Sequence, residues 1–160
     1  MRRIKGNSVQ RIWVNEKGVF YEKINGTVTS LHYDQLESSQ PPVIYNVFPK
    51  TFRKGPTVLR VFVDGKEQTV SFENTDVVYS YYTGNHRELR SLFIQGIQLF
   101  RPDLRIAPYV YSSFYINPKT FEFDKKEYRK TIIIVLVFMI LIFLGIEWYV
   151  HNRYGWSLLF

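Results

Sequence analysis

The feature that most constrains this chain is an apolar run near its C-terminal end, residues 131–146, which contains no charged side chain. A helix rises about 1.5 Å per residue, so residues 131–150 would extend about 30 Å, the thickness of the hydrocarbon core of a bilayer. A helix in the core of a globular protein usually keeps a polar stripe, and this run has none. We therefore predict a transmembrane helix over residues 131–150.

The charged residues around this run predict its orientation. Four cations stand just before it: Lys125, Lys126, Arg129 and Lys130. After it, residues 151–160 contain one Lys or Arg, Arg153. Because Lys and Arg concentrate in the cytoplasmic flanks of membrane helices, we expect a single-pass protein of the inner (cytoplasmic) membrane, with its C-terminus outside. The expected parts are a cytoplasmic domain at 1–124, a basic juxtamembrane linker at 125–130, the transmembrane helix at 131–150 and an extracytoplasmic tail at 151–160.

Both flanks of the run are candidate contacts with lipid. Cations close to an anionic membrane surface are attracted by about 1 kcal/mol per charge, so the lipid-headgroup candidates are Lys125, Lys126, Arg129 and Lys130. Tryptophan and tyrosine favour the membrane interface, and a carboxylate near the headgroups can stay hydrated. The membrane-interface candidates are therefore Glu147, Trp148 and Tyr149.

Composition narrows the function of the remaining residues. The stretch before the apolar run, 1–130, has the length of one ordinary domain. The chain has no cysteine, which excludes disulfides, thiolate metal sites and a cysteine nucleophile. The net charge is +7, but the cations are scattered and no nucleic-acid recognition motif occurs, so nucleic acid is not expected as a partner.

The first half of the chain has the alternation and turn residues of antiparallel sheet. The expected strands are residues 11–14, 19–24, 27–33, 57–63 and 66–72, with another at 43–48. Asn25-Gly26 and Asp64-Gly65 are strong hairpin signals, because a type I′ turn needs positive φ at both central residues. The strand at 43–48 is bounded by prolines, which favour an edge position.

One amphipathic helix is expected to follow. Asn85 with Glu88 has the pattern of a capping box, and the helix should end before Arg101-Pro102. Its apolar face, which we expect to pack on the sheet, comprises Leu89, Leu92, Phe93, Gly96, Ile97 and Phe100. Residues 105–116 return to strand-like alternation, and a short strand at 120–123 leads to the basic linker. The predicted fold class is α+β, an antiparallel β-rich domain with one amphipathic helix and a C-terminal transmembrane helix.

No catalytic signature is visible, so we expect no enzyme and no cofactor. The sequence contains no nucleophile elbow, phosphate loop or metal-ligand spacing. His32 and Asp34 would lie on one face of a predicted strand, but a structural pair is a better interpretation than an acid-base dyad. His86 would lie in the first turn of the helix.

Aromatic residues make up 18% of the chain, and one cluster lies just before the helix. Aromatic side chains are enriched at protein interfaces, so the partner-binding candidates are Tyr79, Tyr81 and Tyr82. The alternative is that the aromatic residues fill the core of the sheet, for which strand propensity gives an ordinary reason.

Several of these patterns occur together in one known family. Residues 15–21, residues 31–36, the Asp64-Gly65 hairpin and the helix from Asn85 give the stretch 11–100 a layout that resembles bacterial pleckstrin-homology-like domains, which are often attached to membrane helices. The resemblance implies a PH-like sheet or partly open barrel, a scaffolding or ligand-docking role, and no catalysis. The chain departs from the family in residues 101–123, which add strand material after the helix that usually closes the fold.

The leading hypothesis is a non-enzymatic membrane protein whose cytoplasmic domain docks a protein partner at the inner membrane face. Confinement near the membrane raises the effective concentration of such a domain, so a modest interface is sufficient. Two alternatives stay open: a bacterial immunity or accessory factor of a secretion or defence membrane complex, and a module that binds anionic lipid. The oligomeric state is not given by the sequence.

Overall fold

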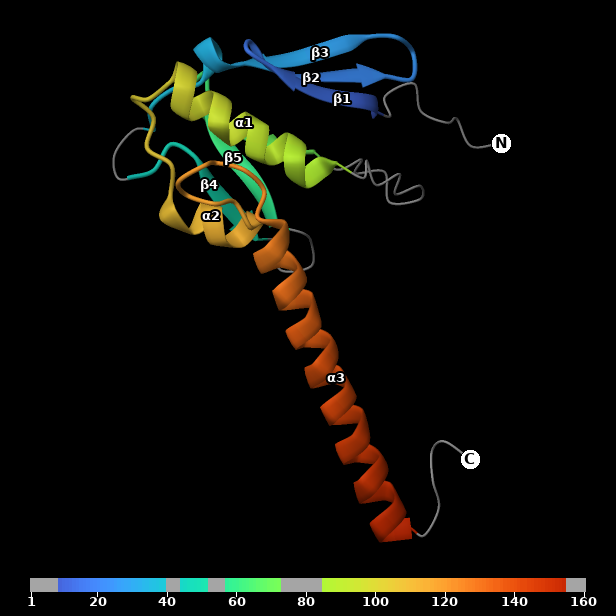
Figure 1. The fold of residues 1–160 in the computed structure, drawn as a ribbon. Helices are drawn as coiled ribbons and strands as arrows, with labels where there is room; N and C mark the ends of the chain where they lie inside the picture. The colour runs from blue at the N-terminus through green and yellow to red at the C-terminus, as the bar shows by residue number, and fades with distance from the viewer. Residues whose placement is uncertain (1–8, 40–43, 52–56, 73–84, 155–160) are drawn as a thin grey trace. The chain divides into compact units, whose positions relative to one another are not determined.

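The computed structural model describes residues 9–39, 44–51, 57–72 and 85–154 (Figure 1). The chain divides into two compact units, Met1–Phe123 and Asp124–Phe160. The described residues form two three-stranded antiparallel sheets and three α-helices, which confirms the α+β class.

The first sheet consists of two hairpins in the order β1-β2-β3. Its strands are β1 (Val9–Asn15), β2 (Gly18–Lys23) and β3 (Val28–His32). One face of this sheet contributes the buried side chains of Ile12, Val19 and Leu31. On the opposite face Trp13 and Phe20 are paired across the strands, with stacked rings 5.4 Å apart. The predicted hairpins are confirmed, because alternation and turn residues are local signals.

The turn of the second hairpin differs from the prediction. Of Asn25 and Gly26, only Gly26 has positive φ, 79°, so the predicted type I′ turn is wrong. The N–H of Gly26 donates to the carbonyl of Lys23 at 2.8 Å, and the N–H of Lys23 donates to the carbonyl of Thr27 at 2.9 Å. This is a longer loop that ends in a left-handed glycine. The Asn25 side chain favours it by accepting the N–H of Thr27 at 3.0 Å.

The second sheet has the order β4-β5-β6 and matches its predicted turn. Its strands are β4 (Phe48–Thr51), β5 (Thr57–Val63) and β6 (Lys66–Val70). Asp64 has φ of 50° and Gly65 has φ of 69°. Positive φ at both central residues is what a type I′ turn requires. The N–H of Gly65 also donates to the carboxylate of Glu37 at 2.7 Å. Residue 37 follows the short 3-10 helix η1 (Tyr33–Gln35), so this bond ties the end of the first sheet to the second.

The strand predicted at 43–48 is displaced toward the C-terminus. Pairing with β5 covers Phe48–Thr51, and Val47 instead forms an isolated parallel bridge with Ile106. Asn46 holds the two segments together beside this bridge. Its N–H donates to the carbonyl of Arg105 at 2.8 Å, and its side-chain oxygen accepts the N–H of Arg105 at 2.6 Å. The edge position is confirmed, and Pro49 lies within β4.

Helix α1 (His86–Phe100) packs on both sheets (Figure 1). The ring of Phe93 lies 5.4 Å from that of Tyr33 and 5.8 Å from that of Phe72, so one core joins the two sheets. The helix ends before Arg101, as predicted. The predicted capping box is absent, because Asn85 has φ −112° and ψ 16° and its side chain makes no cap hydrogen bond. Those angles lie outside the extended region typical of an N-cap.

The strand predicted over 105–116 is wrong, because this segment contains helix α2 (Pro108–Phe114). Proline at the first helical position favours a helix start, and Val110 and Phe114 are buried on one side of the helix. The guanidinium of Arg90 from α1 lies 4.2 Å from the centre of the Phe114 ring. This cation–π contact fixes α2 against α1. After α2 the predicted strand 120–123 is reduced to one antiparallel bridge, Ile116 with Phe123.

The second unit contains helix α3 (Lys125–Tyr154). The carboxylate of Asp124 accepts the N–H groups of Lys126 and Glu127 at 3.0 and 2.9 Å. It therefore caps the first turn of the helix. At the rise of an α-helix, α3 extends about 45 Å. The basic residues 125–130 are helical and continuous with the apolar run.

Candidate functional site

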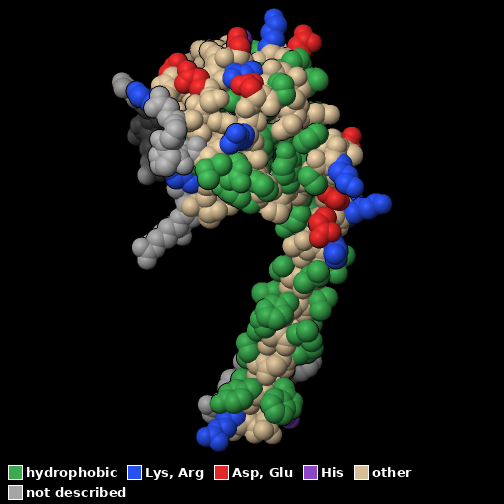
Figure 2. Space-filling model, turned by 90° about the vertical axis from the view of Figure 1, so that its left-hand side faces the viewer, with side chains coloured by type: hydrophobic (Ala, Val, Ile, Leu, Met, Phe, Trp, Pro, Cys, Tyr) green, Lys and Arg blue, Asp and Glu red, His purple; other side chains and the backbone are tan. Residues whose placement is uncertain are grey.

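Helix α3 is long and apolar enough to cross a membrane, and it is the one such helix among the described residues. Every residue from 132 to 146 is exposed within the chain, and the apolar side chains lie on all sides of the helix. Figure 2 shows them along the length of α3, with charged side chains grouped near its start. An exposed apolar surface of this length is stable in lipid and not in water.

The lipid-headgroup candidates lie on the first turns of α3. Lys125, Lys126, Arg129 and Lys130 are all exposed. Successive helical residues are turned by about 100°, so the four cations occupy an arc of about 140°. Glu127 lies outside this arc, and its carboxylate approaches the Lys130 ammonium at 3.7 Å. Such an exposed pair has little energetic weight. The cations thus form one basic face at the start of the apolar segment.

The membrane-interface candidates lie near the other end of α3. Trp148 and Tyr149 are exposed, and Glu147 is half-buried. All three are helical and follow the last uncharged turn. The partner-binding candidates Tyr79, Tyr81 and Tyr82 lie outside the described residues.

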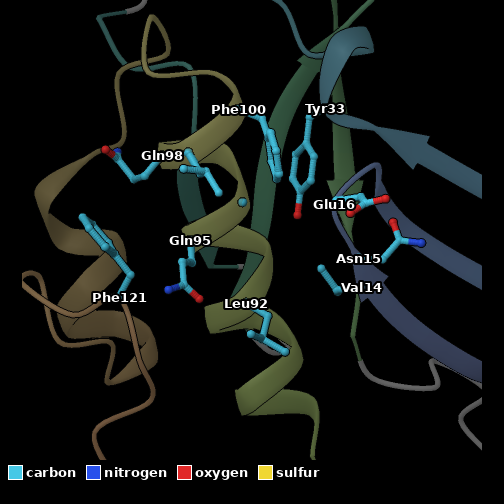
Figure 3. A pocket seen from close by; sticks show the side chains of 11 residues that line it. Val14, Asn15, Glu16, Tyr33, Leu92, Gln95, Gln98, Phe100 and Phe121 are labelled. Carbon is cyan, nitrogen blue, oxygen red and sulfur yellow. The ribbon is translucent and has the colours of Figure 1, made fainter.

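The N-terminal unit contains an open groove of about 570 Å³ that crosses the outward side of α1. Figure 3 shows the β1–β2 turn on one side of the helix and Phe121 on the other. The groove, called the α1 groove below, is lined by Val14, Asn15, Glu16, Tyr33, Leu92, Gln95, Gly96, Gln98, Leu99, Phe100 and Phe121.

Its apolar side chains include two that were expected in the core. Leu92 and Phe100 are 47% and 45% exposed, so their prediction as core residues is wrong, whereas Leu89, Phe93 and Ile97 are buried as predicted. Leu99 is 70% exposed, more than either. The sheets cover the part of α1 that carries Phe93, Ile94 and Ile97. Leu92, Leu99 and Phe100 lie on the outward side of the helix and are exposed.

The floor of the groove is formed by Tyr33 and Gly96. Tyr33 is 3% exposed, and its ring stacks on those of Phe93 and Phe100, each 5.4 Å away. A side chain at Gly96 would overlap the Tyr33 hydroxyl, so glycine is required where the ring lies against the helix. The buried Tyr33 hydroxyl has no hydrogen-bond partner among the described residues. Burial raises the pKa of Tyr33 to about 12. The hydroxyl is therefore neutral at pH 7 and can donate a hydrogen bond.

Arg101 fixes the part of the groove that is formed by Tyr33 and the C-terminal end of α1. Its guanidinium donates to the carbonyl of Tyr33 at 3.1 Å and to the carbonyl of Leu36. It also donates to both carboxylate oxygens of Asp103, at 2.9 and 2.8 Å. The side-chain hydrogen bond from Arg101 holds the pKa of Asp103 below its usual range. The planar guanidinium thus joins the C-terminal end of α1 to η1, whose first residue is Tyr33.

The polar lining of the groove is mostly uncharged. Its described residues supply the amides of Asn15, Gln95 and Gln98 and one carboxylate, Glu16. The side-chain oxygen of Asn15 accepts the N–H of Lys17 at 2.8 Å, which fixes the β1–β2 turn at the edge of the groove. Phe121 has φ of 58° and packs on Tyr111. Positive φ is costly for an aromatic residue. An open, apolar surface with a few amides is suited to binding another apolar surface.

No group of three His, Cys, Asp or Glu side chains among the described residues could hold a metal ion. The predicted placement of His32 and Asp34 on one strand is wrong, because His32 ends β3 and Asp34 lies in η1. His86 lies in the first turn of α1, as predicted, and is buried.

Sequence reasoning did not find the α1 groove. Leu99 was an available signal, because it extends the row of Leu92 by two helical turns on the same side of the helix. The contribution of Tyr33 and of the β1–β2 turn depends on packing between segments distant in the chain. No protein-family model matches this chain, and neither the characterised proteins nor the solved structures compared with it include a match.

Proposed function

We propose that the chain is a non-enzymatic single-pass membrane protein whose N-terminal domain docks a protein partner at the cytoplasmic face of the membrane. The observation that carries this proposal is α3, which is long and apolar enough to cross a bilayer and whose apolar residues are exposed on all sides. Attachment keeps the domain in a thin layer beside the membrane, so a modest docking surface gains from raised effective concentration.

The proposed orientation depends on the basic face of α3. Four cations precede the apolar segment and Arg153 alone among Lys and Arg follows it, which favours a cytoplasmic N-terminal domain. Protease treatment of inverted and right-side-out inner-membrane vesicles tests this orientation. The domain should be digested in inverted vesicles and protected in right-side-out vesicles, and the opposite pattern would contradict it.

The α1 groove supports the docking role. Leu92, Leu99 and Phe100 present large apolar groups beside a hollow, and hot spots of binding energy usually consist of such groups next to pockets. A photoreactive residue in place of Gln95, in the full-length chain in cells, should give one discrete cross-linked protein product. The matched control is the same residue at Ile24, which is exposed in the β2–β3 turn. Equal patterns from both positions would contradict docking through the groove.

The fold of the domain, as we propose it, is related to the pleckstrin-homology-like family. Two three-stranded antiparallel sheets followed by a helix that packs on both support this relation. Helix α2 and the loop after it replace the strand material that was expected beyond α1. A docking or scaffolding role agrees with that relation.

A second candidate role, binding of anionic lipid, is favoured by the basic face of α3. Four exposed cations on one arc would attract phosphate headgroups at the start of the apolar segment. Electron paramagnetic resonance of spin-labelled lipids around the reconstituted full-length chain should show a preference for phosphatidylglycerol over phosphatidylcholine. Replacing all four cations by glutamine should remove that preference, and an unchanged preference would refute this role.

A further inference from the structure

The charge-free part of α3 is shorter than the hydrocarbon core of an average bilayer. Lys130 precedes this part, Glu147 follows it, and the residues between them carry no charge. The helix is continuous from Lys125 to Tyr154, so the helical rise alone sets the distance between the two charged residues. From residue 130 to residue 147 a rise of about 1.5 Å per residue gives about 26 Å, against about 30 Å for the hydrocarbon core. A tilt of the helix would shorten this span along the membrane normal further.

At the N-terminal end of this segment a charged side chain can reach water easily. In an α-helix every side chain leaves the backbone tilted toward the N-terminus, which at this end leads out of the membrane. Lys130 follows this direction, because its ammonium lies 3.7 Å from the carboxylate of Glu127, three residues earlier. A long lysine side chain can keep its charge in water while its backbone enters the hydrocarbon. The hydroxyl of Thr131 is satisfied within the helix, since it donates to the carbonyl of Glu127 at 3.1 Å.

Glu147, at the C-terminal end of the segment, lacks this freedom. Here the same tilt directs a side chain back toward the middle of the membrane. The side chain of glutamate is also shorter than that of lysine. Because a carboxylate in the hydrocarbon is costly, the backbone of Glu147 itself has to stay at the interface. Trp148 and Tyr149 follow at once, are exposed within the chain, and favour the same interface.

We propose that Glu147 sets the depth of α3 in the membrane. It keeps the C-terminal end of the helix at the interface in bilayers of different thickness, and the Lys130 end moves into or out of the hydrocarbon to take up the difference. Glu147 is thus a positioning residue, and what it recognises is the boundary between hydrocarbon and headgroups. The inference rests on the proposed function, because it requires that α3 spans the membrane. It holds for either orientation of the chain.

Tryptophan fluorescence at the two ends tests this inference, since the emission maximum moves to shorter wavelength when the indole leaves water. The full-length chain is reconstituted in phosphatidylcholine vesicles whose acyl chains range from short to long. With Trp13→Phe and Trp156→Phe, Trp148 is the one remaining tryptophan and reports the C-terminal end. Its emission should stay constant across the lipid series. Adding Trp148→Phe and Tyr128→Trp gives a second chain that reports the other end, and its emission should shift by several nanometres to shorter wavelength in the long lipids.

Matched substitutions separate Glu147 from its aromatic neighbours, which favour the interface on their own. In the chain that reports Trp148, Glu147→Leu should let the emission shift by several nanometres to shorter wavelength in the long lipids, because the uncharged segment then continues to Val150. Lys130→Leu removes one charge at the other end and should leave the Trp148 emission constant. A Trp148 emission that shifts while Glu147 is present, or an equal response to the two leucine substitutions, would overturn the inference.

The outcomes separate this inference from the proposed function. Flotation of the vesicles on a density gradient after an alkaline wash shows whether the chain is inserted. A chain that floats with the vesicles but whose Trp148 emission follows the length of the lipid overturns the inference and leaves the membrane anchor intact. A chain that stays at the bottom of the gradient overturns the proposed function and the inference together.

Discussion

Replacing Tyr33 by phenylalanine should stabilise the N-terminal domain, although most substitutions of buried residues destabilise a fold. The hydroxyl of Tyr33 is buried without a hydrogen-bond partner in the part of the chain that the structure describes. Such a group costs about 1–3 kcal/mol. Phenylalanine keeps the ring, and therefore the stacking on Phe93 and Phe100. Taking the lower end, the free energy of unfolding should rise by about 1 kcal/mol. For a domain of this size that gain corresponds to an increase in melting temperature of about 4 °C.

Tyr21 provides the matched control. Its side chain is hydrogen-bonded to the backbone of Ser71. Tyr21→Phe should therefore lower the free energy of unfolding by about 1 kcal/mol. Both variants of the full-length chain are compared in detergent by near-ultraviolet circular dichroism during heating, which reports tertiary packing. The two melting temperatures should move in opposite directions. A decrease for Tyr33→Phe as large as that for Tyr21→Phe would show that the Tyr33 hydroxyl has a stabilising partner, and would refute the reasoning.

Three further predictions concern the same region. Gly96→Ala should lower the free energy of unfolding by about 1–3 kcal/mol despite the better helix propensity of alanine, because its methyl group would overlap the Tyr33 ring. An unchanged melting temperature would contradict this packing. The pKa of Tyr33 is about 12 in the folded chain and about 10 when unfolded, so its ionisation does not affect stability below pH 10 and lowers the free energy of unfolding as the pH rises from 10 toward 12. Urea unfolding should therefore show a smaller alkaline loss for Tyr33→Phe than for the natural chain, and equal losses would count against it. Arg101→Lys should lower the free energy of unfolding nearly as much as Arg101→Ala, by about 1.5–3 kcal/mol, because an ammonium group cannot reproduce the hydrogen bonds to Asp103 and to two carbonyls. Full stability of the lysine variant would show that these bonds do not stabilise the domain.

The parts of the fold that follow from local sequence were predictable. Asp64-Gly65 sets its own turn, and the period of α1 is visible without knowledge of its neighbours. Residues 105–116 were predicted as a strand because their aromatic and aliphatic side chains have a strand-like spacing. Pro108 instead starts a helix, and Val110 and Phe114, one helical turn apart, are both buried. Packing between distant segments overrode the local pattern there.

The candidate sites divide in the same way. The apolar segment of α3 and its flanking cations are continuous in sequence, and their pattern could be read directly. The α1 groove needs η1, the β1–β2 turn and α1 together, so periodicity alone assigned Leu92 and Phe100 to the core. Periodicity gives the apolar residues of a helix, but only the position of the sheets decides which of them are covered.

Membrane attachment by α3 is tested most directly by alkaline carbonate extraction of the membranes of cells that express the full-length chain. This treatment releases proteins held by charge, including any bound only through the four cations of α3, and leaves bilayer-spanning helices in the pellet. Insertion of α3 predicts that the chain stays in the pellet and is released only by detergent. Recovery of the chain in the carbonate supernatant would contradict it.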